Sequence, residues 1–246
     1  MKPVRVAFKL VRTLLHVLRG WWIIRSRFDR LSQPEREQEV QRWAAQMLRI
    51  FGIRLVRRGP ALAPGPVLLV ANHISWLDIL VMHACGYCRF ISKADVHRWP
   101  LIGGMAASAG TLFIERESRR NAMRVVHHMV DRLQAGDVLA VFPEGTTGDG
   151  VTLKPFHANL IQAAIAADVP VQPVALRFAD GRTGAMSLAP RFIDDDTLIG
   201  SVLQTLGADD LQAEVTTGEP QSREGRDRRR WAADLHAAVD ALRRPT

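Results

Sequence analysis

The chain has 246 residues, of which 47% are hydrophobic and 24% are charged. This balance is typical of a globular protein, and it excludes both a largely disordered chain and one that crosses a membrane many times. The length suits one large domain, and no linker divides it. A formal net charge of +8 predicts an anionic partner, either nucleic acid or a membrane rich in acidic lipid.

The two cysteines, Cys85 and Cys88, are too few for a disulfide framework, so a reducing compartment fits the sequence best. Their spacing matches a redox pair or half of a zinc site, and His83 and His97 are near enough in sequence to complete four ligands. Ligand pairs of zinc sites are usually farther apart, however, and a redox pair of this spacing opens a helix. We therefore expect no metal, and two small buried side chains that lead into a strand.

The first fifty residues are predicted to form two amphipathic helices that pair as a hairpin. In the first, from Val4 to Arg25, basic residues recur every three or four positions and share one stripe: Arg5, Lys9, Arg12, His16 and Arg19. An apolar row has the same period: Val4, Phe8, Val11, Leu15, Leu18 and Trp22. The second helix is expected from Gln33 to Phe51, because Pro34 stands near its start and Gly52 follows its end.

Residues 1–50 are predicted to lie on a membrane rather than to cross it. No stretch here reaches 18 apolar residues without a charge, which disfavours a transmembrane helix. We expect the basic edge of the first helix to face acidic headgroups, with Trp21, Trp22 and Ile23 at the hydrocarbon boundary. A cleavable signal peptide fits poorly, because charges run through the whole segment. The alternative is a helix that packs on its own domain.

Residues 51–246 are predicted to form one α/β domain, because short apolar runs alternate with helical patterns. The expected strands are Val67–Ala71, Phe90–Ser92, Leu112–Ile114, Val138–Phe142 and Val171–Phe178. The clearest helix runs from Asn121 to Gln134, and a terminal helix extends from Trp231 to Leu242. This order predicts a mainly parallel central sheet flanked by helices and preceded by the helical hairpin. Ligands of such sheets bind where the strands end.

Polar residues follow the first of these strands. A histidine such as His73, with a carboxylate a few residues later, can act as a general base. On a regular helix His73 and Asp78 would lie about 140° apart, so a loop must turn the histidine back. Ser75 and Asp78 also match a capping box, in which Asp78 would bind the Ser75 amide and orient nothing. This segment alone leaves catalysis and capping open.

Two further strand ends carry groups that suit a phosphate. Leu112–Ile114 is followed by Glu115 and Arg116, and the run that ends at Phe142 is followed by Pro143, Glu144, Gly145 and Thr146. An arginine can bind a phosphate through two parallel hydrogen bonds, and a Gly-Thr turn offers backbone amides and a hydroxyl. Each segment is a weak signal by itself. Three such polar segments, each after a predicted strand, together indicate a site.

Together these segments resemble the glycerophospholipid acyltransferases with an NHxxxxD motif, typified by bacterial 1-acylglycerol-3-phosphate acyltransferase. The resemblance covers roughly residues 50 to 180, and ordered blocks are far more specific than one short motif. Four blocks occur in the order of the family: Asn72 to Asp78, Gly110 to Arg116, Phe142 to Thr146, and Val169 to Val174. The last is a buried strand with structural prolines and receives no chemical role.

The resemblance implies an enzyme that moves a fatty-acyl group from a thioester of acyl carrier protein or coenzyme A to the free hydroxyl of lysophosphatidic acid, giving phosphatidic acid. His73 would deprotonate the hydroxyl, Asp78 would orient and charge His73, and no acyl-enzyme would form. The thioester is a co-substrate, and alcoholysis of a thioester needs no metal or other cofactor. The expected place of work is the cytoplasmic face of the bacterial inner membrane.

By the same resemblance, Arg116, Glu144, Gly145 and Thr146 would shape the acceptor pocket. Arg116 would bind the phosphate, and Glu144 would hold the site through hydrogen bonds. Lys93 matches a basic position of the family and would add a second cation. The sequence departs from the commonest pattern after Thr146, which loosens the acceptor assignment, since related members use lyso-ornithine lipids that lack a phosphate monoester.

Two other classes of protein compete with this reading. A basic protein could bind a membrane or nucleic acid without catalysis, but the one-sided charge of the first helix suits a lipid surface, so we expect no nucleic acid. A serine hydrolase or thioesterase would pass the acyl group to water. No Gly-x-Ser-x-Gly elbow is present, and Ser75 is poorly placed for a nucleophile.

Overall fold

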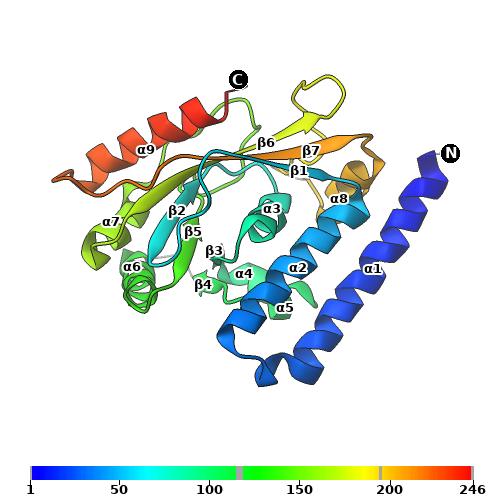
Figure 1. Ribbon diagram of the computed structural model, residues 1–246, viewed down its shortest axis with the longest axis horizontal. Coiled ribbons are helices and arrows are strands. Elements are labelled where there is room, and N and C mark those ends of the chain that lie inside the picture. Colours follow the sequence, from blue (N-terminus) through cyan, green and yellow to red (C-terminus); the bar gives the residue numbers. More distant parts are fainter. Residues whose placement is uncertain (1, 115–118, 194–195, 245–246) are drawn as a thin grey trace.

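A seven-stranded sheet forms the centre of the computed structural model, which describes residues 2–114, 119–193 and 196–244 (Figure 1). The strands are β1 (Arg54–Arg58), β2 (Val67–Ala71), β3 (Arg89–Lys93), β4 (Leu112–Ile114), β5 (Val138–Val141), β6 (Val171–Asp180) and β7 (Leu211–Thr217). Their order in space is β1-β7-β6-β2-β5-β3-β4, and the neighbours are parallel except for the antiparallel pair β6 and β7. The predicted mainly parallel sheet is confirmed.

Helices cover both faces of this sheet, so its central strand β2 is buried on both sides. Leu68 and Val70 pack toward α6 (Arg119–Gln134), α7 (Ala158–Ala167) and α9 (Arg228–Leu242). Val67, Leu69 and Ala71 pack toward α2 (Gln33–Phe51) and α3 (Leu77–Cys85). The other helices of this domain are α4 (Ala94–His97), α5 (Ile102–Ser108) and α8 (Leu198–Gly207). The alternation along β2 is that of a parallel sheet between two helical layers.

Two strands were not predicted, and both lie toward one edge of the sheet. β1 has the sequence Arg-Leu-Val-Arg-Arg, which is too charged to stand out as a strand. β7 alternates buried and half-buried residues, and it pairs with β1 in parallel and with β6 in antiparallel register. The five predicted strands lie within two residues of their expected ends, and β2 and β4 match at both ends.

The N-terminal helical hairpin is confirmed. It consists of α1 (Lys2–Arg27), the short 3-10 turn η1 (Phe28–Arg30) and α2. The backbone N–H and the hydroxyl of Ser32 both donate to Glu35, which closes a capping box at the start of α2. At its end Gly52 has a φ of 74°, a left-handed conformation that glycine adopts without steric cost.

The orientation predicted for the basic stripe of α1 is wrong in part. Lys9 donates from Nζ to the backbone oxygen of Phe51 at 2.6 Å, so it faces the protein. His16 is buried and its ring stacks on that of Trp43, with 4.9 Å between the ring centroids. Ile23, expected at a hydrocarbon boundary, is also buried. Thus α1 packs on its own domain through part of its basic stripe.

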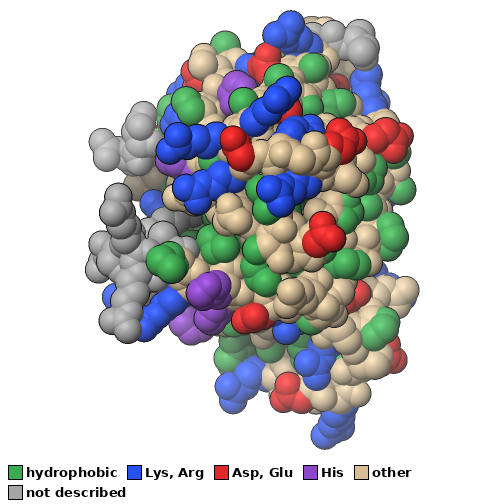
Figure 2. All heavy atoms as spheres, turned by 90° about the vertical axis from the view of Figure 1, so that its left-hand side faces the viewer, with side chains coloured by type: hydrophobic (Ala, Val, Ile, Leu, Met, Phe, Trp, Pro, Cys, Tyr) green, Lys and Arg blue, Asp and Glu red, His purple; other side chains and the backbone are tan. Residues whose placement is uncertain are grey.

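The apolar row of α1 faces solvent instead. Its members are between 53% and 75% exposed: Val4, Phe8, Val11, Leu15, Leu18 and Trp22. At the opposite end of the molecule, hydrophobic side chains are scattered among charged ones of both signs (Figure 2). No helix within the described ranges combines the length and the hydrophobicity needed to cross a membrane.

Of the two cysteines expected to be buried, Cys88 is, whereas Cys85, the last residue of α3, is half-buried. Cys88 is fully buried directly before β3, and burial raises the pKa of the Cys85 thiol to about 11. A thiol with a raised pKa is a poor nucleophile and a poor metal ligand. His83 is buried beside the rings of Tyr87 and Phe90, whereas His97 is exposed on α4. In the described ranges no cluster of three or more His, Cys, Asp or Glu side chains is arranged to hold a metal.

His83 should make the fold sensitive to acid. Burial lowers the pKa of His83 from 6.5 to about 4. Between these two pH values the unfolded chain binds a proton at this residue and the folded chain does not. The free energy of unfolding should therefore fall by about 3 kcal/mol from this residue as the pH drops to about 4. Urea titrations of wild type and of His83→Phe across this range measure it. An equally steep decline in the variant would contradict the assignment, and His128→Phe, at an exposed position, is the control.

Candidate active site

His73 stands directly beyond β2, at the carboxyl edge of the sheet. The preceding residue, Asn72, is buried and ties β2 to β6, because its side-chain amide donates to the Leu176 oxygen at 2.9 Å and its side-chain oxygen accepts from the Leu176 N–H at 2.7 Å. The His73 side chain is half-buried, with 18% of it exposed. Its ring stacks on that of Phe142, with 4.0 Å between the centroids and 6° between the planes.

The carboxylate of Asp78 gathers the loop between β2 and α3. Its Oδ2 accepts from the backbone N–H groups of Ile74 at 2.6 Å and Ser75 at 2.9 Å, and it lies 2.8 Å from Nδ1 of His73. The side chain is fully buried, and within the described residues its other oxygen has no hydrogen-bond partner. The two alternatives for Asp78 therefore coincide, since the same oxygen caps the loop and contacts the histidine.

This contact determines which ring nitrogen of His73 can accept a proton. An ionised carboxylate only accepts hydrogen bonds, so Nδ1 of His73 carries the proton when it meets Asp78. Nε2 then keeps its lone pair. The carboxylate also stabilises the imidazolium that forms when Nε2 takes up a proton. A histidine held in this way on one side by Asp78 and on its face by Phe142 has the arrangement of a general base.

Glu144 joins the loop of His73 to the loop that follows β5. One carboxylate oxygen accepts from the His73 N–H at 2.7 Å, and the other accepts from the Lys154 N–H at 2.9 Å. The backbone oxygen of His73 in turn accepts from the Gly148 N–H at 2.7 Å. Burial raises the pKa of Glu144, while the two backbone N–H groups act in the opposite direction. Glu144 thus contacts the backbone of His73 rather than its ring.

The other predicted residues lie at the same edge of the sheet where the structure describes them. Gly145 has a φ of 74° and donates its N–H to the Phe142 oxygen, which makes the tight turn after Glu144. Thr146 follows it and is exposed. Lys93 is exposed at the end of β3, the parallel neighbour of β5. Arg116 lies outside the described residues.

Three contributions were not predicted: the Asn72 bridge between β2 and β6, the Phe142 stack, and the Lys154 backbone contact. Asn72 gives a detectable signal, since it is an amide at the exit of an apolar run. Phe142 is the last residue of another apolar run, and nothing in its spacing marks it as the partner of a ring 69 positions away. The Nζ of Lys154 also donates to the Thr147 oxygen at 2.8 Å, which closes the loop after Glu144.

A cavity of about 320 Å³ includes Ile74, the residue after His73, and the acidic Asp149 in its lining. Its apolar wall consists of Ile74, Leu176, Phe178, Met186 and Leu188, and its cationic members are Arg177, Arg191, Arg243 and Arg244. The segment that carries Arg191 is held against the active-site loop, because the Phe192 N–H donates to the Ile74 oxygen at 3.1 Å. Apolar walls with a few charged groups are typical of sites for amphipathic ligands.

Comparisons with known proteins point to one family. Residues 52–177 match the family described as acyltransferase. The chain is 35% identical to a lyso-ornithine lipid O-acyltransferase of Pseudomonas aeruginosa over 225 residues, which cover 90% of this chain and 85% of that protein. It is 41% identical to a 1-acyl-sn-glycerol-3-phosphate acyltransferase of Neisseria gonorrhoeae over 144 residues, which cover 58% of this chain and 56% of the relative.

A solved structure shares the fold over nearly its whole length. The crystal structure of the 1-acyl-sn-glycerophosphate acyltransferase from Thermotoga maritima aligns with a TM-score of 0.65 and 18% sequence identity. The alignment covers 97% of this chain and 99% of the other. At this identity the likeness concerns the fold.

Glu144→Gln tests the bridge between the two loops. Glutamine keeps the size of the side chain but has a single acceptor oxygen, so the N–H of either His73 or Lys154 loses its partner. We expect a loss of about 1–3 kcal/mol in the free energy of unfolding, measured by chemical denaturation, because a buried N–H is left unpaired. The exposed Glu219→Gln is the matched control. A Glu144→Gln protein as stable as wild type would show that the bridge contributes nothing.

Proposed function

Because this chain belongs to the acyltransferase family, we propose that it transfers a fatty-acyl group from a thioester to the free hydroxyl of a lysolipid, with 1-acylglycerol-3-phosphate as the first acceptor to test. The observation that supports this reaction is the 2.8 Å contact between Nδ1 of His73 and Oδ2 of Asp78, which leaves Nε2 to accept a proton. The donor is a thioester of acyl carrier protein or of coenzyme A.

The proposed reaction needs only the groups at the strand ends. Nε2 of His73 takes the proton of the acceptor hydroxyl as its oxygen attacks the thioester carbonyl carbon. The resulting tetrahedral species collapses, the carbon–sulfur bond breaks, and the leaving thiolate receives the proton from the imidazolium. Asp78 stabilises the imidazolium between these steps. A general base of this kind typically contributes ~10²–10⁴-fold to the rate.

The acceptor is proposed to bind along the edge of the sheet beside His73. Lys93 is an exposed cation there, and the turn at Gly145 and Thr146 follows the residue that holds the His73 backbone. Arg116 is proposed as the ligand of the phosphate on the basis of the sequence alone. The cavity that includes Ile74 has an apolar wall for an acyl chain and a cationic part for an anionic group.

A lyso-ornithine lipid is the second candidate acceptor. It is favoured by the alignment over 90% of this chain with a relative that carries the name lyso-ornithine lipid O-acyltransferase. The two acceptors differ in the group beside the reacting hydroxyl, because only lysophosphatidic acid has a phosphate monoester. Both reactions would use His73 in the same role.

We also propose that the enzyme works at a membrane surface, on the cytoplasmic face of the inner membrane. The exposed apolar row of α1 supports the contact with a membrane, since exposed contiguous apolar residues indicate an interaction surface and Trp22 suits the lipid–water boundary. Arg12, Arg19 and Arg25 are exposed on the same helix and would meet acidic headgroups.

His73→Ala should abolish turnover in a protein that still folds. The assay supplies protein in detergent with labelled acyl-acyl carrier protein or acyl-coenzyme A and a panel of lysolipids, and it identifies the product. We expect the rate to fall by at least ~10²-fold with every acceptor, because the general base is gone. His128→Ala, at an exposed position of α6, should act like wild type. Equal rates in both variants would remove the proposed mechanism.

Replacing Phe8, Leu15 and Trp22 of α1 with serine tests the membrane surface. These three side chains are exposed, so the fold should persist, while binding to phosphatidylcholine vesicles in a flotation assay should weaken at least about tenfold. Met123→Ser removes an exposed hydrophobic side chain from α6 and serves as control. Unchanged vesicle binding by the triple variant would exclude this face as the membrane contact.

A further inference from the structure

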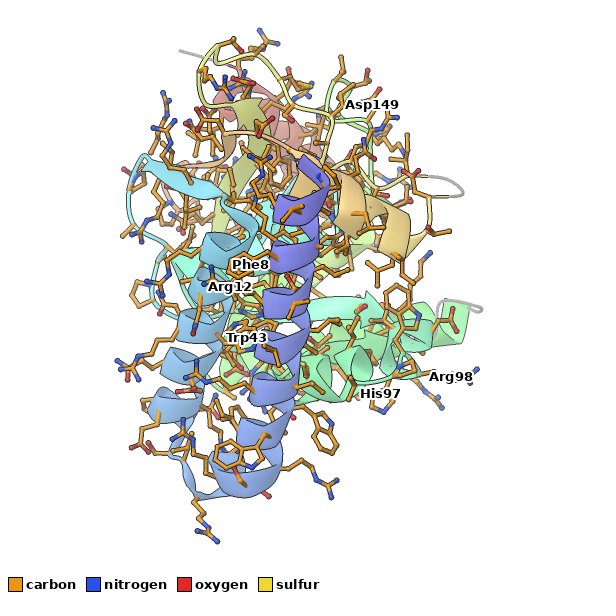
Figure 3. The ribbon with its side chains drawn as sticks, turned by 90° about the vertical axis from the view of Figure 1, so that its right-hand side faces the viewer. Phe8, Arg12, Trp43, His97, Arg98 and Asp149 are labelled. Atoms are coloured by element: carbon orange, nitrogen blue, oxygen red, sulfur yellow. The ribbon has the colours of Figure 1, made fainter. Side chains whose placement is uncertain are left out.

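A cationic cavity lies between the two helices of the N-terminal hairpin, away from His73. It has a volume of about 360 Å³, within the range of ligand pockets. Its lining comes from both helices: His16, Arg19, Ile23 and Arg27 of α1, and Glu39, Arg42, Trp43, Gln46 and Arg49 of α2. The two helices lie side by side, and Trp43 stands where they meet (Figure 3).

The charge of this cavity is not balanced by the protein. Four guanidinium groups face one carboxylate, that of Glu39. Arg27 approaches Glu39 at 3.5 Å, and Arg19 donates one N–H to Gln46 at 3.0 Å. Within the described ranges Arg42 and Arg49 have neither a hydrogen-bond nor an ion-pair partner for their side chains. All four arginines are exposed, and an anion among them would reduce the repulsion between their like charges.

A contact between the two helices, from His16 to Trp43, forms part of the wall of the cavity. The rings of His16 and Trp43 stack, and each residue is bonded to the other, since the Trp43 ring N–H donates to the His16 oxygen at 3.2 Å and Nε2 of His16 lies 3.0 Å from the Trp43 oxygen. Arg42 and Arg49 are seven positions apart, so they share one face of α2. A guanidinium group matches a phosphate through two parallel hydrogen bonds.

The surroundings of the cavity indicate which phosphate fits. Arg19 lines the cavity, and the exposed Arg12 stands seven positions before it on the same face of α1. Figure 3 shows Phe8 and Arg12 close together on this helix. The guanidinium of Arg12 lies 5.6 Å from the centroid of the Phe8 ring. A ligand with its phosphate among the arginines would have its chains beside this row. That is the form of a lipid rather than of a free phosphate.

We propose that the cavity between α1 and α2 binds the phosphate-bearing headgroup of an acidic phospholipid, as a site separate from the active site. The inference rests on the membrane contact proposed above, and it adds a defined headgroup site to it. The apolar row would supply the general attraction to a bilayer. The cavity would make that attraction depend on phosphate-bearing acidic lipid and would orient the hairpin on the surface.

The experiment compares vesicles and two double variants. The full chain is floated with vesicles of phosphatidylcholine, of phosphatidylcholine with phosphatidylglycerol, and of phosphatidylcholine with enough oleate to give the same surface charge. The test variant is Arg42→Gln with Arg49→Gln. The control is Arg229→Gln with Arg230→Gln, which removes the same charge from exposed positions of α9. A calorimetric titration with dihexanoyl phosphatidylglycerol and with inorganic phosphate separates a lipid headgroup from a free anion.

We expect the test variant to bind phosphatidylglycerol vesicles about tenfold more weakly, and the control to stay within about twofold of wild type. Wild type should prefer phosphatidylglycerol to oleate, and the short-chain lipid should give a saturable signal that inorganic phosphate does not. Equal losses in the two double variants, equal binding to oleate vesicles, or phosphate binding as tight as the lipid would each overturn the proposal. His73→Ala should keep this binding, so failure of the catalytic proposal is separately visible.

Discussion

The active-site loop depends on the buried carboxylate of Asp78. An ionised carboxylate away from water is costly unless hydrogen bonds satisfy it, and here one oxygen collects the N–H groups of Ile74 and Ser75 together with the ring of His73. The loop cannot relax without leaving that carboxylate unpaired. The same carboxylate oxygen therefore fixes both the start of α3 and the orientation of His73. A substitution that disturbs one of them disturbs the other.

The parallel pairing of β2 and β5 places Glu144 level with His73 at the carboxyl edge of the sheet. Val70 of β2 is paired with Val141 of β5, and His73 and Glu144 each follow three residues later. The segments that follow β2 and β5 leave the sheet side by side, so the Glu144 carboxylate is close enough to accept a hydrogen bond from the His73 N–H. The Phe142 ring, one residue beyond β5, then lies against the imidazole. Two short loops at adjacent strand ends are thereby bonded to each other.

The N-terminal hairpin shows how a basic residue can be directed inward. Lys9 meets the backbone oxygen of Phe51, at the end of α2, at 2.6 Å and that of Leu206, near the end of α8, at 3.4 Å. Carbonyl groups at the carboxyl end of a helix lack partners and carry partial negative charge, so a cation there is stabilised. With Lys9 and His16 turned toward the body, the apolar row of α1 is left on the outside, beside the arginines that line the α1–α2 cavity.

Local pattern alone determined much of this protein. Signals that span only a few neighbouring residues predicted the hairpin, five strands and a site after them. These signals are the period of the apolar residues, Gly52, and the apolar runs before Asn72 and Pro143. Charged β1 carried no such signal, whereas the period-two alternation of β7 is a strand signal that the prediction missed. Only the tertiary structure decided that Asp78 both caps and contacts His73, that Phe142 stacks on it, and which face of α1 is outside. These features depend on contacts between segments distant in sequence. The pattern of an amphipathic helix does not indicate which surface its apolar face contacts.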